Sequence, residues 1–204
     1  STLVNLIPRF FDATGGQVLV DGVDVRQMSQ RQLRERIGFV PQKALLFRGT
    51  IRENIAYGKP DATEDEILAA AKTAQALEFI REKPGGLDAP VAQLGQNFSG
   101  GQKQRLSIAR ALVRRPEVYI FDDSFSALDA KTDAALRAAL KETTGDATVL
   151  IVAQKVSTVM DADRILVLDG GGCVGMGTHR ELLQSCPVYQ EIDYTQMTAE
   201  EEEA

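Results

Sequence analysis

Short apolar runs alternate along the chain with segments in which apolar residues follow a helical spacing. Strands are predicted at Gln17–Val20, Ile37–Val40, Val118–Phe121, Thr148–Val152 and Arg164–Leu168. Helices are predicted at residues 3–10, 64–82, 100–114 and 130–142. This alternation predicts an α/β fold with a largely parallel sheet. The long interval between the second and third strands has a mostly helical pattern. We therefore expect a helical subdomain, at about residues 50–115, inserted into the α/β core.

The charge balance of the chain is acidic. Its 204 residues include 23 basic and 29 acidic side chains, which give a formal net charge of −6. A dedicated nucleic-acid-binding protein usually carries a basic patch, so this balance argues against nucleic acid as a partner. Part of the acidic excess lies in residues 200–203. We expect one domain over residues 1–196 and a disordered acidic tail over residues 197–204.

Cysteine and histidine are too sparse to predict a metal site of their own. Cys173 and Cys186 lie far apart and form no C-x-x-C motif, which predicts unpaired thiols in a reducing compartment. His179 is the single histidine, and we expect it at the surface or at the start of a helix. We expect no signal peptide, and no apolar run approaches the roughly 20 residues needed to span a bilayer.

Polar side chains follow several of the predicted strands. Asp122 and Asp123 come at the end of the third strand, Gln42 follows the second and Gln154 follows the fourth. Ligands of open α/β sheets bind at the carboxyl ends of the strands. Each of these residues alone also fits a solvated turn or a polar loop. Together they predict a ligand site, in which Asp122 would hold the Mg²⁺ of a bound nucleotide.

The helix predicted at residues 100–114 begins with a short polar and glycine-rich stretch: Ser99, Gly100, Gly101 and Gln102. Free backbone N–H groups and the positive end of the helix dipole make such a start a site for anions. The same stretch also fits a capping box, because its first and last residues have the S-x-x-Q spacing. Both interpretations hold at the same time.

Two further helix starts carry capping residues. Thr63 and Glu66 fit a capping box at the start of the helix predicted at residues 64–82. In the stretch after the two acids, Ser126 fits an N-cap and Asp129 falls in the first turn.

The motifs stand in an order that resembles a known family. Phe98–Gln102, followed by KQRLSIARAL, resembles the signature motif of ATP-binding-cassette (ABC) proteins, and YIFDD and SALD follow at the usual spacing. By this resemblance Asp122 matches the Walker B acid, residues 126–129 match the D-loop with its Asp129, and Gln42 matches the Q-loop glutamine. The resemblance extends to about residue 189. It implies a RecA-like P-loop NTPase core with an inserted helical subdomain, and a site for ATP and Mg²⁺.

Two segments are similar to those of exporter-type cassettes. They are LLFRGTIRENIAYG, at Leu45–Gly58, and IVAQKVSTVMDADRILVLDGG, at residues 151–171. In the family, the first of these segments faces the coupling helices of the membrane domain. The resemblance therefore implies an exporter with transmembrane domains as partners, located at the cytoplasmic face of the cell membrane.

The family's P-loop, G-x-x-x-x-G-K-[ST], falls directly before the start of this chain. Ser1 matches its last residue, whose hydroxyl ligates Mg²⁺ together with Gln42 and Asp122, and Thr2 follows in the nucleotide site. The P-loop glycines and lysine, the first core strand and the aromatic residue that stacks on adenine are missing. The resemblance thus implies a cassette truncated within its Walker A motif. We expect such a chain to bind ATP weakly or not at all by itself.

Two catalytic positions depart from the family pattern. Asp123 stands where Glu usually positions the attacking water, and its side chain is shorter by roughly 1.5 Å, one C–C bond. Gln154 stands where His is usual, and an amide takes up no proton near neutral pH. Gln93, in place of a common Glu, is either a third departure or a neutral loop variation. These residues predict a degenerate site that binds ATP and hydrolyses it slowly.

The signature at Ser99–Gln102, by contrast, is complete. In the family, two cassettes dimerise head to tail, and each ATP lies between the P-loop of one chain and the signature of the other. We therefore expect a second ABC nucleotide-binding domain as a partner, in a heterodimer to which this chain contributes a working signature.

Other interpretations remain open. In a homodimeric exporter, Asp123 would itself be active. A soluble cassette ATPase of DNA repair or chromosome maintenance would need a long coiled coil between Gln42 and Ser99, which the sequence lacks. A purely regulatory ATP-binding module would leave the exporter-like segment Leu45–Gly58 unexplained. An ordinary α/β domain would have to carry the ordered motifs by chance.

Overall fold

The computed structural model describes the backbone of residues 1–203 and the side chains as far as residue 198. The chain divides into two compact units, Ser1–Val152 and Ala153–Ala204. The single domain expected over residues 1–196 stays a prediction. Each unit has its own hydrophobic core and is described separately below.

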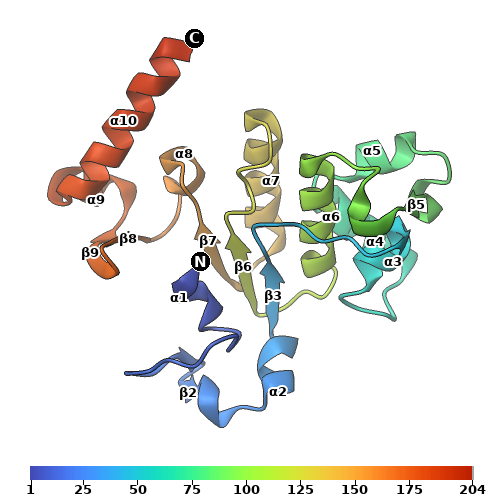
Figure 1. Ribbon diagram of the computed structural model, residues 1–204, viewed down its shortest axis with the longest axis horizontal. Helices are drawn as coiled ribbons and strands as arrows, with labels where there is room; N and C mark the ends of the chain where they lie inside the picture. Colours follow the sequence, from blue (N-terminus) through green and yellow to red (C-terminus); the bar gives the residue numbers. More distant parts are fainter. Residues whose placement is uncertain (204) are drawn as a thin grey trace. The chain divides into compact units, whose positions relative to one another are not determined.

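A parallel three-stranded sheet lies at the centre of the first unit (Figure 1). Its order is β3 (Ile37–Val40), β6 (Val118–Asp122) and β7 (Thr148–Val152), with Ile37 opposite Val118 and Val118 opposite Thr148. The central strand β6 is almost continuously apolar because both of its faces are covered, as parallel strands require. Since all three strands are parallel, their carboxyl ends share one edge of the sheet.

The N-terminal region packs against the Ile120 side of β6. It contains α1 (Thr2–Asn5), the hairpin of β1 (Leu19–Val20) and β2 (Val23–Asp24), the 3₁₀ turn η1 (Val25–Gln27) and α2 (Gln30–Glu35). Val4, Val20, Leu33 and Ile120 belong to one buried cluster. The helix predicted at residues 3–10 is shorter than expected, and the strand predicted at Gln17–Val20 pairs only through its last two residues.

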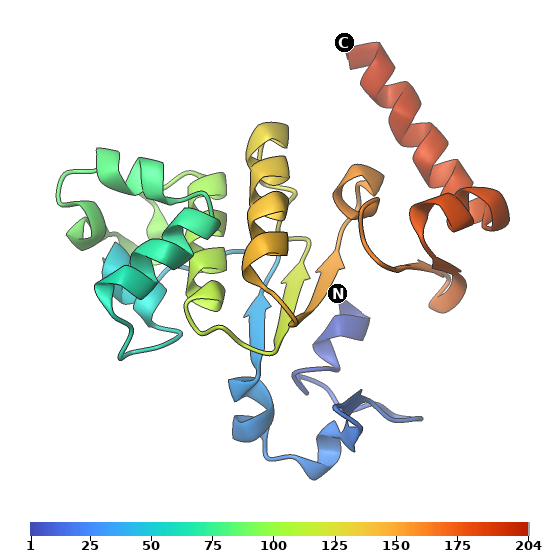
Figure 2. The same ribbon diagram turned by 180° about the vertical axis from the view of Figure 1, so that it is seen from behind.

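Helices fill the interval between β3 and β6, as the sequence predicts, and lie together beyond β3 (Figure 2). They are α3 (Ile51–Ala56), α4 (Glu64–Thr73), α5 (Leu77–Glu82) and α6 (Gly100–Leu112), together with the 3₁₀ turns η2 (Gly86–Asp88) and η3 (Gln93–Gly95) and the short antiparallel pair β4 (Gly49–Thr50) and β5 (Pro90–Val91). The capping box of Thr63 and Glu66 is present. The predicted helix 64–82 is interrupted at Gln75, whose φ of 56° is left-handed.

The helix α7 (Ala130–Thr143) connects β6 to β7 and completes the larger core of the first unit. Its Leu136 and Leu140 are buried in the same cluster as Phe121 and Leu106. A helix that connects two adjacent parallel strands and packs on their sheet is the βαβ arrangement expected of this fold class.

The second unit, as far as residue 203, is an antiparallel hairpin with three helices. It consists of α8 (Val156–Val159), β8 (Ile165–Asp169), β9 (Gly172–Gly177), α9 (His179–Ser185) and α10 (Pro187–Glu203). Gly170 and Gly171 join β8 to β9 with positive φ values of 55° and 85°, which favour a type I′ hairpin turn. Val156, Val167, Leu182 and Tyr189 contribute to its core.

Several smaller predictions concern this second unit. His179 begins α9, and Cys173 and Cys186 are free thiols, as predicted. The backbone of α10 is helical through residues 197–203, where a disordered tail was expected. Residue 204 and the side chains after residue 198 lie outside the described part of the chain, so the acidic tail stays a prediction. None of the helices described is both long and apolar enough to cross a bilayer.

Candidate nucleotide site at the carboxyl edge of the sheet

The first element of the site is a contact between Ser1, the first residue of the first unit, and Asp122, the last residue of its central strand. The strand β6 ends at Asp122, which is 6% exposed. Ser1, just before α1, donates from its hydroxyl to Asp122 Oδ1 at 2.7 Å. The two residues are 121 positions apart in the sequence. The fold thus places a hydroxyl and a buried carboxylate side by side, both oxygen groups that suit Mg²⁺.

The second element is the acid that follows the strand. Asp123 has a φ of 49°, and its N–H donates to the carbonyl of Val152 at 2.9 Å. Its carboxylate accepts a hydrogen bond from Gln42, Nε2 to Oδ2, at 2.8 Å. The glutamine that follows β3 and the acid that follows β6 therefore meet at the same edge, as the sequence predicts.

Two serines after the acids fix the direction in which the chain leaves β6. Ser124 is fully buried and donates to the carbonyl of Val40 at 2.9 Å. Ser126 donates to the carbonyl of Asp123 at 2.9 Å. These bonds tie the exit of β6 to the end of β3 and hold Asp123 in its left-handed conformation. The sequence analysis did not single out Ser124, although a polar residue directly after a buried strand is a signal for such a role.

A buried glutamine supports the site from α6. Gln104 is 2% exposed and donates from Nε2 to the carbonyl of Pro41 at 3.2 Å. Pro41 directly precedes Gln42, so this bond fixes the backbone that presents the Q-loop amide. Gln104 was also missed by the sequence analysis. The available signal was a polar side chain on the face of α6 that carries the buried Ile108 and Ala111.

The start of α6 is a capping box. Ser99 Oγ accepts from the N–H of Gln102 at 3.2 Å, and Gln102 Oε1 accepts from the N–H of Ser99 at 3.1 Å. This confirms the capping interpretation and leaves the helix dipole available for an anion. A Cβ added to Gly101 would lie 3.1 Å from the carbonyl oxygen of Ala127, whereas one added to Gly100 would meet nothing within 4 Å. The 126–129 loop therefore approaches the signature closely at Gly101.

The predicted roles of Ser126 and Asp129 need correction. Asp129, not Ser126, is the N-cap of α7. Asp129 accepts from the N–H of Thr132 at 2.9 Å and from its hydroxyl at 2.7 Å. These hydrogen bonds hold the pKa of Asp129 below its ordinary value. Ser126 donates to the carbonyl of Asp123 instead, and α7 begins at Ala130, the residue predicted for its start.

Gln154 belongs to the second unit. It follows β7 and precedes α8, and its main-chain carbonyl accepts from Gln196 Nε2 at 2.7 Å. Thr2 is the first residue of α1, and Gln93 is the first residue of η3. Both of these side chains are exposed.

Arg110 braces the segment Leu45–Gly58 from α6. Its guanidinium donates to the carbonyls of Asn54 and Leu45 at 2.8 Å and to Asn54 Oδ1 at 2.9 Å. The rings of Phe47 and Tyr57 lie 4.9 and 5.9 Å from it. Burial lowers the pKa of Arg110. Leu45, Phe47 and Tyr57 are nevertheless 54%, 46% and 65% exposed. The segment therefore presents exposed apolar side chains, and the hydrogen bonds of Arg110 hold its backbone in place.

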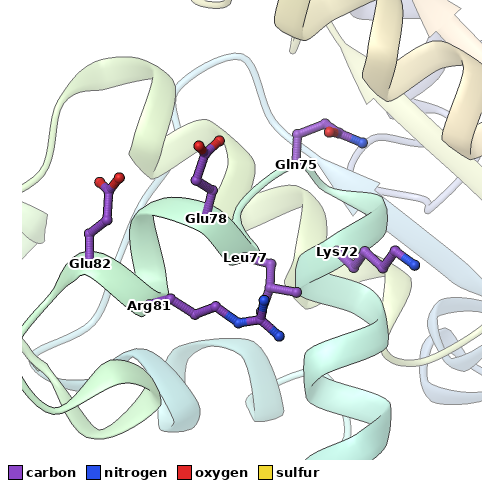
Figure 3. Close-up of a pocket in the computed structure, with 6 residues that line it drawn as sticks. All are labelled: Lys72, Gln75, Leu77, Glu78, Arg81 and Glu82. Atoms are coloured by element: carbon purple, nitrogen blue, oxygen red, sulfur yellow. The ribbon is translucent and has the colours of Figure 1, made fainter.

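A hollow on the surface of α4 and α5 has a different character (Figure 3). It has a volume of about 460 Å³, and its lining is mostly charged, of both signs: Lys72, Gln75, Leu77, Glu78, Arg81 and Glu82. None of the predicted site residues lines it. We therefore assign the candidate site to the edge of the sheet.

The residues at this edge fit a magnesium ion held jointly with phosphates. Among the residues described, no group of three or more His, Cys, Asp or Glu side chains could hold a metal. Mg²⁺ seldom needs such a group, since it binds through one or two carboxylates, waters and substrate phosphates. The Ser1 hydroxyl and the Asp122 carboxylate are suitable ligands. Gln42 donates through Nε2, so its amide oxygen can serve a cation.

Comparison with known proteins gives a consistent result. The family model described as ABC transporter matches residues 1–126. An uncharacterised ABC transporter ATP-binding protein of Mycobacterium tuberculosis is 50% identical over 199 residues, covering 96% of this chain and 34% of the relative. A similarly described protein of Bacillus subtilis is 48% identical over 204 residues, covering 100% of this chain and 35% of the relative.

A third relative and a solved structure add the export context. A protein of Staphylococcus aureus is named for multidrug export as an ATP-binding and permease protein, a role that its name marks as unproven. It is 45% identical over 192 residues, covering 94% of this chain and 33% of the relative. The structure of a bacterial Atm1-family ABC exporter with ATP bound is 39% identical, with a TM-score of 0.92 over 96% of this chain and 34% of that one. The chain spans about a third of the length of the proteins it matches.

Proposed function

This chain belongs to the ABC transporter family, whose ATP-binding domains are ATPases, and we propose on that basis that it is the nucleotide-binding domain of an exporter. In this proposal it binds ATP with Mg²⁺ at the carboxyl edge of its sheet and couples binding and hydrolysis to export of a substrate across the membrane. The observation that carries the proposal is the 2.7 Å hydrogen bond from Ser1 to Asp122, which brings together the two residues that match Mg²⁺ ligands of the family.

Ser1, Asp122 and the amide oxygen of Gln42 would hold the metal, and Thr2 would adjoin the phosphates at the start of α1. When bound, Mg²⁺ would neutralise charge on the β- and γ-phosphate oxygens. The protein's own contribution is to present these oxygens from a fixed backbone. Ser124 and Gln104 supply that rigidity through their bonds to Val40 and Pro41.

Asp123 and Gln154 would act on the attacking water and the γ-phosphate. The Asp123 carboxylate would accept a hydrogen bond from the water, and the Gln154 amide would donate one to the phosphate. Asp123 reaches less far than a glutamate, and misplacement of about 1 Å can lower a rate on the order of a hundredfold. This argues for slow hydrolysis at this chain's own site.

A second nucleotide-binding domain would complete the site. The capped start of α6, Ser99–Gln102, would face the ATP held by the partner, where its N–H groups and dipole favour the phosphate anion. A complete signature beside a slow catalytic pair supports a heterodimer in which the partner hydrolyses ATP. The hydrogen bond between Gln42 and Asp123 favours a second candidate, a homodimer whose own site is active, because it shows an oriented acid.

The segment Leu45–Gly58 would transmit changes at the site to transmembrane domains. Its exposed Leu45, Phe47 and Tyr57 form an apolar contact surface that Arg110 holds in place. The permease in the printed name of the S. aureus relative supports a membrane partner. In this proposal the domain lies at the cytoplasmic face of the membrane.

ATPase measurements on the intact protein that contains this chain would test the proposal. The protein would be assayed alone and with a partner cassette that carries Glu at the position of Asp123. Little activity alone and strong activity with the partner supports the heterodimer, whereas strong activity alone supports the homodimer. No Mg²⁺-dependent ATP binding in any combination would overturn the proposal. The variant Asp122→Asn is the control for loss of the metal ligand.

To isolate this chain's own site, the catalytic Glu of the partner would be replaced by Gln in every sample. Asp123→Glu should then raise the residual turnover at this site. Unchanged turnover would show that the short acid does not limit hydrolysis.

A further inference from the structure

One side chain of α10 holds the backbone on both sides of Lys155. Gln196 Oε1 accepts from the N–H of Val156 at 2.8 Å, and Gln196 Nε2 donates to the carbonyl of Gln154 at 2.7 Å. The primary amide thus uses one donor and its acceptor on two backbone groups of the same short segment. Gln196 lies 42 positions after Gln154 in the sequence, so only the packing of α10 in the second unit brings them together.

The segment that Gln196 holds leads into a very short helix that has no side-chain cap. The helix α8 has four residues, and its N-cap, Lys155, makes no side-chain capping bond. A helix this short is not stable by its own hydrogen bonds, and the N–H groups of its first turn need partners from outside the helix. The amide of Gln196 supplies such a partner to Val156, the first residue of α8.

The position of Gln196 is itself fixed by packing. It follows Tyr189 by seven residues, so both lie on the same face of α10. Tyr189 is 3% exposed, and its hydroxyl forms a hydrogen bond of 2.8 Å with Nδ1 of His179. The helix α10 packs against α8, α9 and β8. The helix that carries Gln196 is therefore anchored by the hydrophobic core of the second unit.

We propose that Gln196 is a positioning residue for Gln154. By holding the carbonyl of Gln154 and the N–H of Val156, it fixes the backbone from which the Gln154 side chain extends, and so sets where that amide can meet a nucleotide. This inference rests on the proposed function, in which Gln154 acts at the γ-phosphate. It makes α10 a determinant of turnover without giving it any contact with ATP.

The test uses the intact protein with the hydrolytic residue of any partner site disabled. Gln196→Leu removes both hydrogen bonds while keeping a side chain of similar size. Gln190→Leu is the matched control, because Gln190 is an exposed residue of the same helix whose Nε2 bonds only the carbonyl of Leu183 among the hydrogen bonds described. The measured quantities are kcat and KM for ATP, the unfolding temperature, and hydrogen exchange of the Val156 amide.

For Gln196→Leu we expect kcat to fall about tenfold, with KM for ATP changed less than about twofold, because positioning and not ground-state binding is lost. The Val156 amide should lose protection, and Gln190→Leu should change none of these quantities. A merely structural role would instead lower the unfolding temperature and leave kcat of the folded protein unchanged, and this result would overturn the proposal.

The variant Gln154→Ala distinguishes a failure of the positioning role of Gln196 from a failure of the role proposed for Gln154. If Gln196 acts through Gln154, then Gln154→Ala lowers kcat and adding Gln196→Leu lowers it no further. If Gln154→Ala lowers kcat and Gln196→Leu does not, the positioning role is wrong and the proposed function stands. If Gln154→Ala has no effect, the assignment of Gln154 and the positioning role both fall. Should Gln196→Leu not fold, Gln196→Glu keeps the acceptor for Val156 and replaces the donor to Gln154 with a carboxylate oxygen that repels its carbonyl, so kcat should fall with it and an unchanged kcat would overturn the proposal.

Discussion

Gln42 donates a hydrogen bond to Asp123, Nε2 to Oδ2 at 2.8 Å, across 81 positions of sequence. The contact joins the loop after β3 to the loop after β6. It links a residue that we propose binds the metal with one that we propose acts on the attacking water. Any movement of the Q-loop that displaces the Gln42 amide must therefore also change the hydrogen bonding of the Asp123 carboxylate.

Gln42→Ala should lower both stability and turnover. It removes a charge-assisted hydrogen bond from a carboxylate that is 7% exposed, which costs about 1–3 kcal/mol of unfolding free energy. Turnover at this site should fall about tenfold or more, because the Asp123 carboxylate loses its hydrogen bond from Gln42. Urea unfolding and ATPase assays measure the two effects. Lys43→Ala, at the exposed neighbouring position, is the control, and an equal loss in that variant would contradict the role of the Gln42 bond.

Ser1→Ala in the intact protein should reduce the Mg²⁺-dependent part of ATP binding. The substitution removes the hydroxyl that now bonds Asp122, while Ser1→Thr retains a hydroxyl at the same position. We expect the affinity for ATP in Mg²⁺ to fall about tenfold in the alanine variant, which corresponds to about 1.4 kcal/mol. Affinity in EDTA should stay the same. Titration calorimetry in Mg²⁺ and in EDTA distinguishes a lost metal ligand from a general loss of nucleotide binding.

Gly100→Ala and Gly101→Ala should have different effects on stability, although the two glycines are adjacent. Alanine is favoured over glycine in a helix by up to about 1 kcal/mol, and a Cβ at Gly100 meets open space. A Cβ at Gly101 meets a backbone carbonyl at 3.1 Å, which requires the 126–129 loop to move. Urea unfolding should therefore show a gain for the first variant and no gain, or a loss, for the second. Equal gains would show that the loop yields freely.

Arg110→Met should destabilise the first unit by about 2–4 kcal/mol. It removes the hydrogen bonds to Asn54 and Leu45 and the contacts with the two exposed aromatic rings. Arg110→Lys should recover only part of this loss, because an ammonium group lacks the planar fork of the guanidinium. Arg31→Met is the control, since the Arg31 side chain is 88% exposed and pairs only within α2 among the ion pairs described, and it should change stability by less than about 0.5 kcal/mol.

The pH dependence of stability should show the N-cap of α7. The pKa of Asp129 is lower in the folded protein than its ordinary value of 3.8. Asp129 therefore stabilises the fold fully above about pH 3.8. Its contribution is lost as the pH falls from 3.8 through the lower folded pKa. Comparison of the wild-type protein with Asp129→Asn at a series of pH values should show a difference that is constant near neutral pH and shrinks below pH 3.8. A difference that grows on acidification would contradict the assignment.

Hydrophobic patterning predicted the parts of the fold in which burial alone decides the structure. The bounds predicted for the strands Ile37–Val40 and Thr148–Val152 are those of β3 and β7. Both strands pair with the buried central strand β6, and their apolar runs begin and end with the strand. The polar residues at the strand ends likewise predicted that side chains after β3 and β6 lie at one edge, and Gln42 and Asp123 do meet there.

Other features depend on interactions that no single segment reveals. The break at Gln75 carries no sequence signal, because glutamine is an ordinary helix residue that here adopts a left-handed φ. Asp129 is the N-cap of α7, and Ser126 is not, because the Ser126 hydroxyl already bonds the carbonyl of Asp123. One omission was avoidable. Asp21-Gly22, with φ values of 49° and 76°, forms the turn of the β1–β2 hairpin, and D-G is a strong hairpin signal.

The left-handed backbone at Asp123 sets stability against activity at this position. Aspartate and asparagine tolerate positive φ better than longer side chains, because their short polar groups bond locally. A glutamate at the same φ would extend its carboxylate further but would fit the left-handed backbone less well. Aspartate thus causes less backbone strain than glutamate at this position. A gain in turnover from Asp123→Glu should come with a less stable domain. At position 123, the residue that best stabilises the fold and the residue that would give the higher turnover are therefore expected to differ.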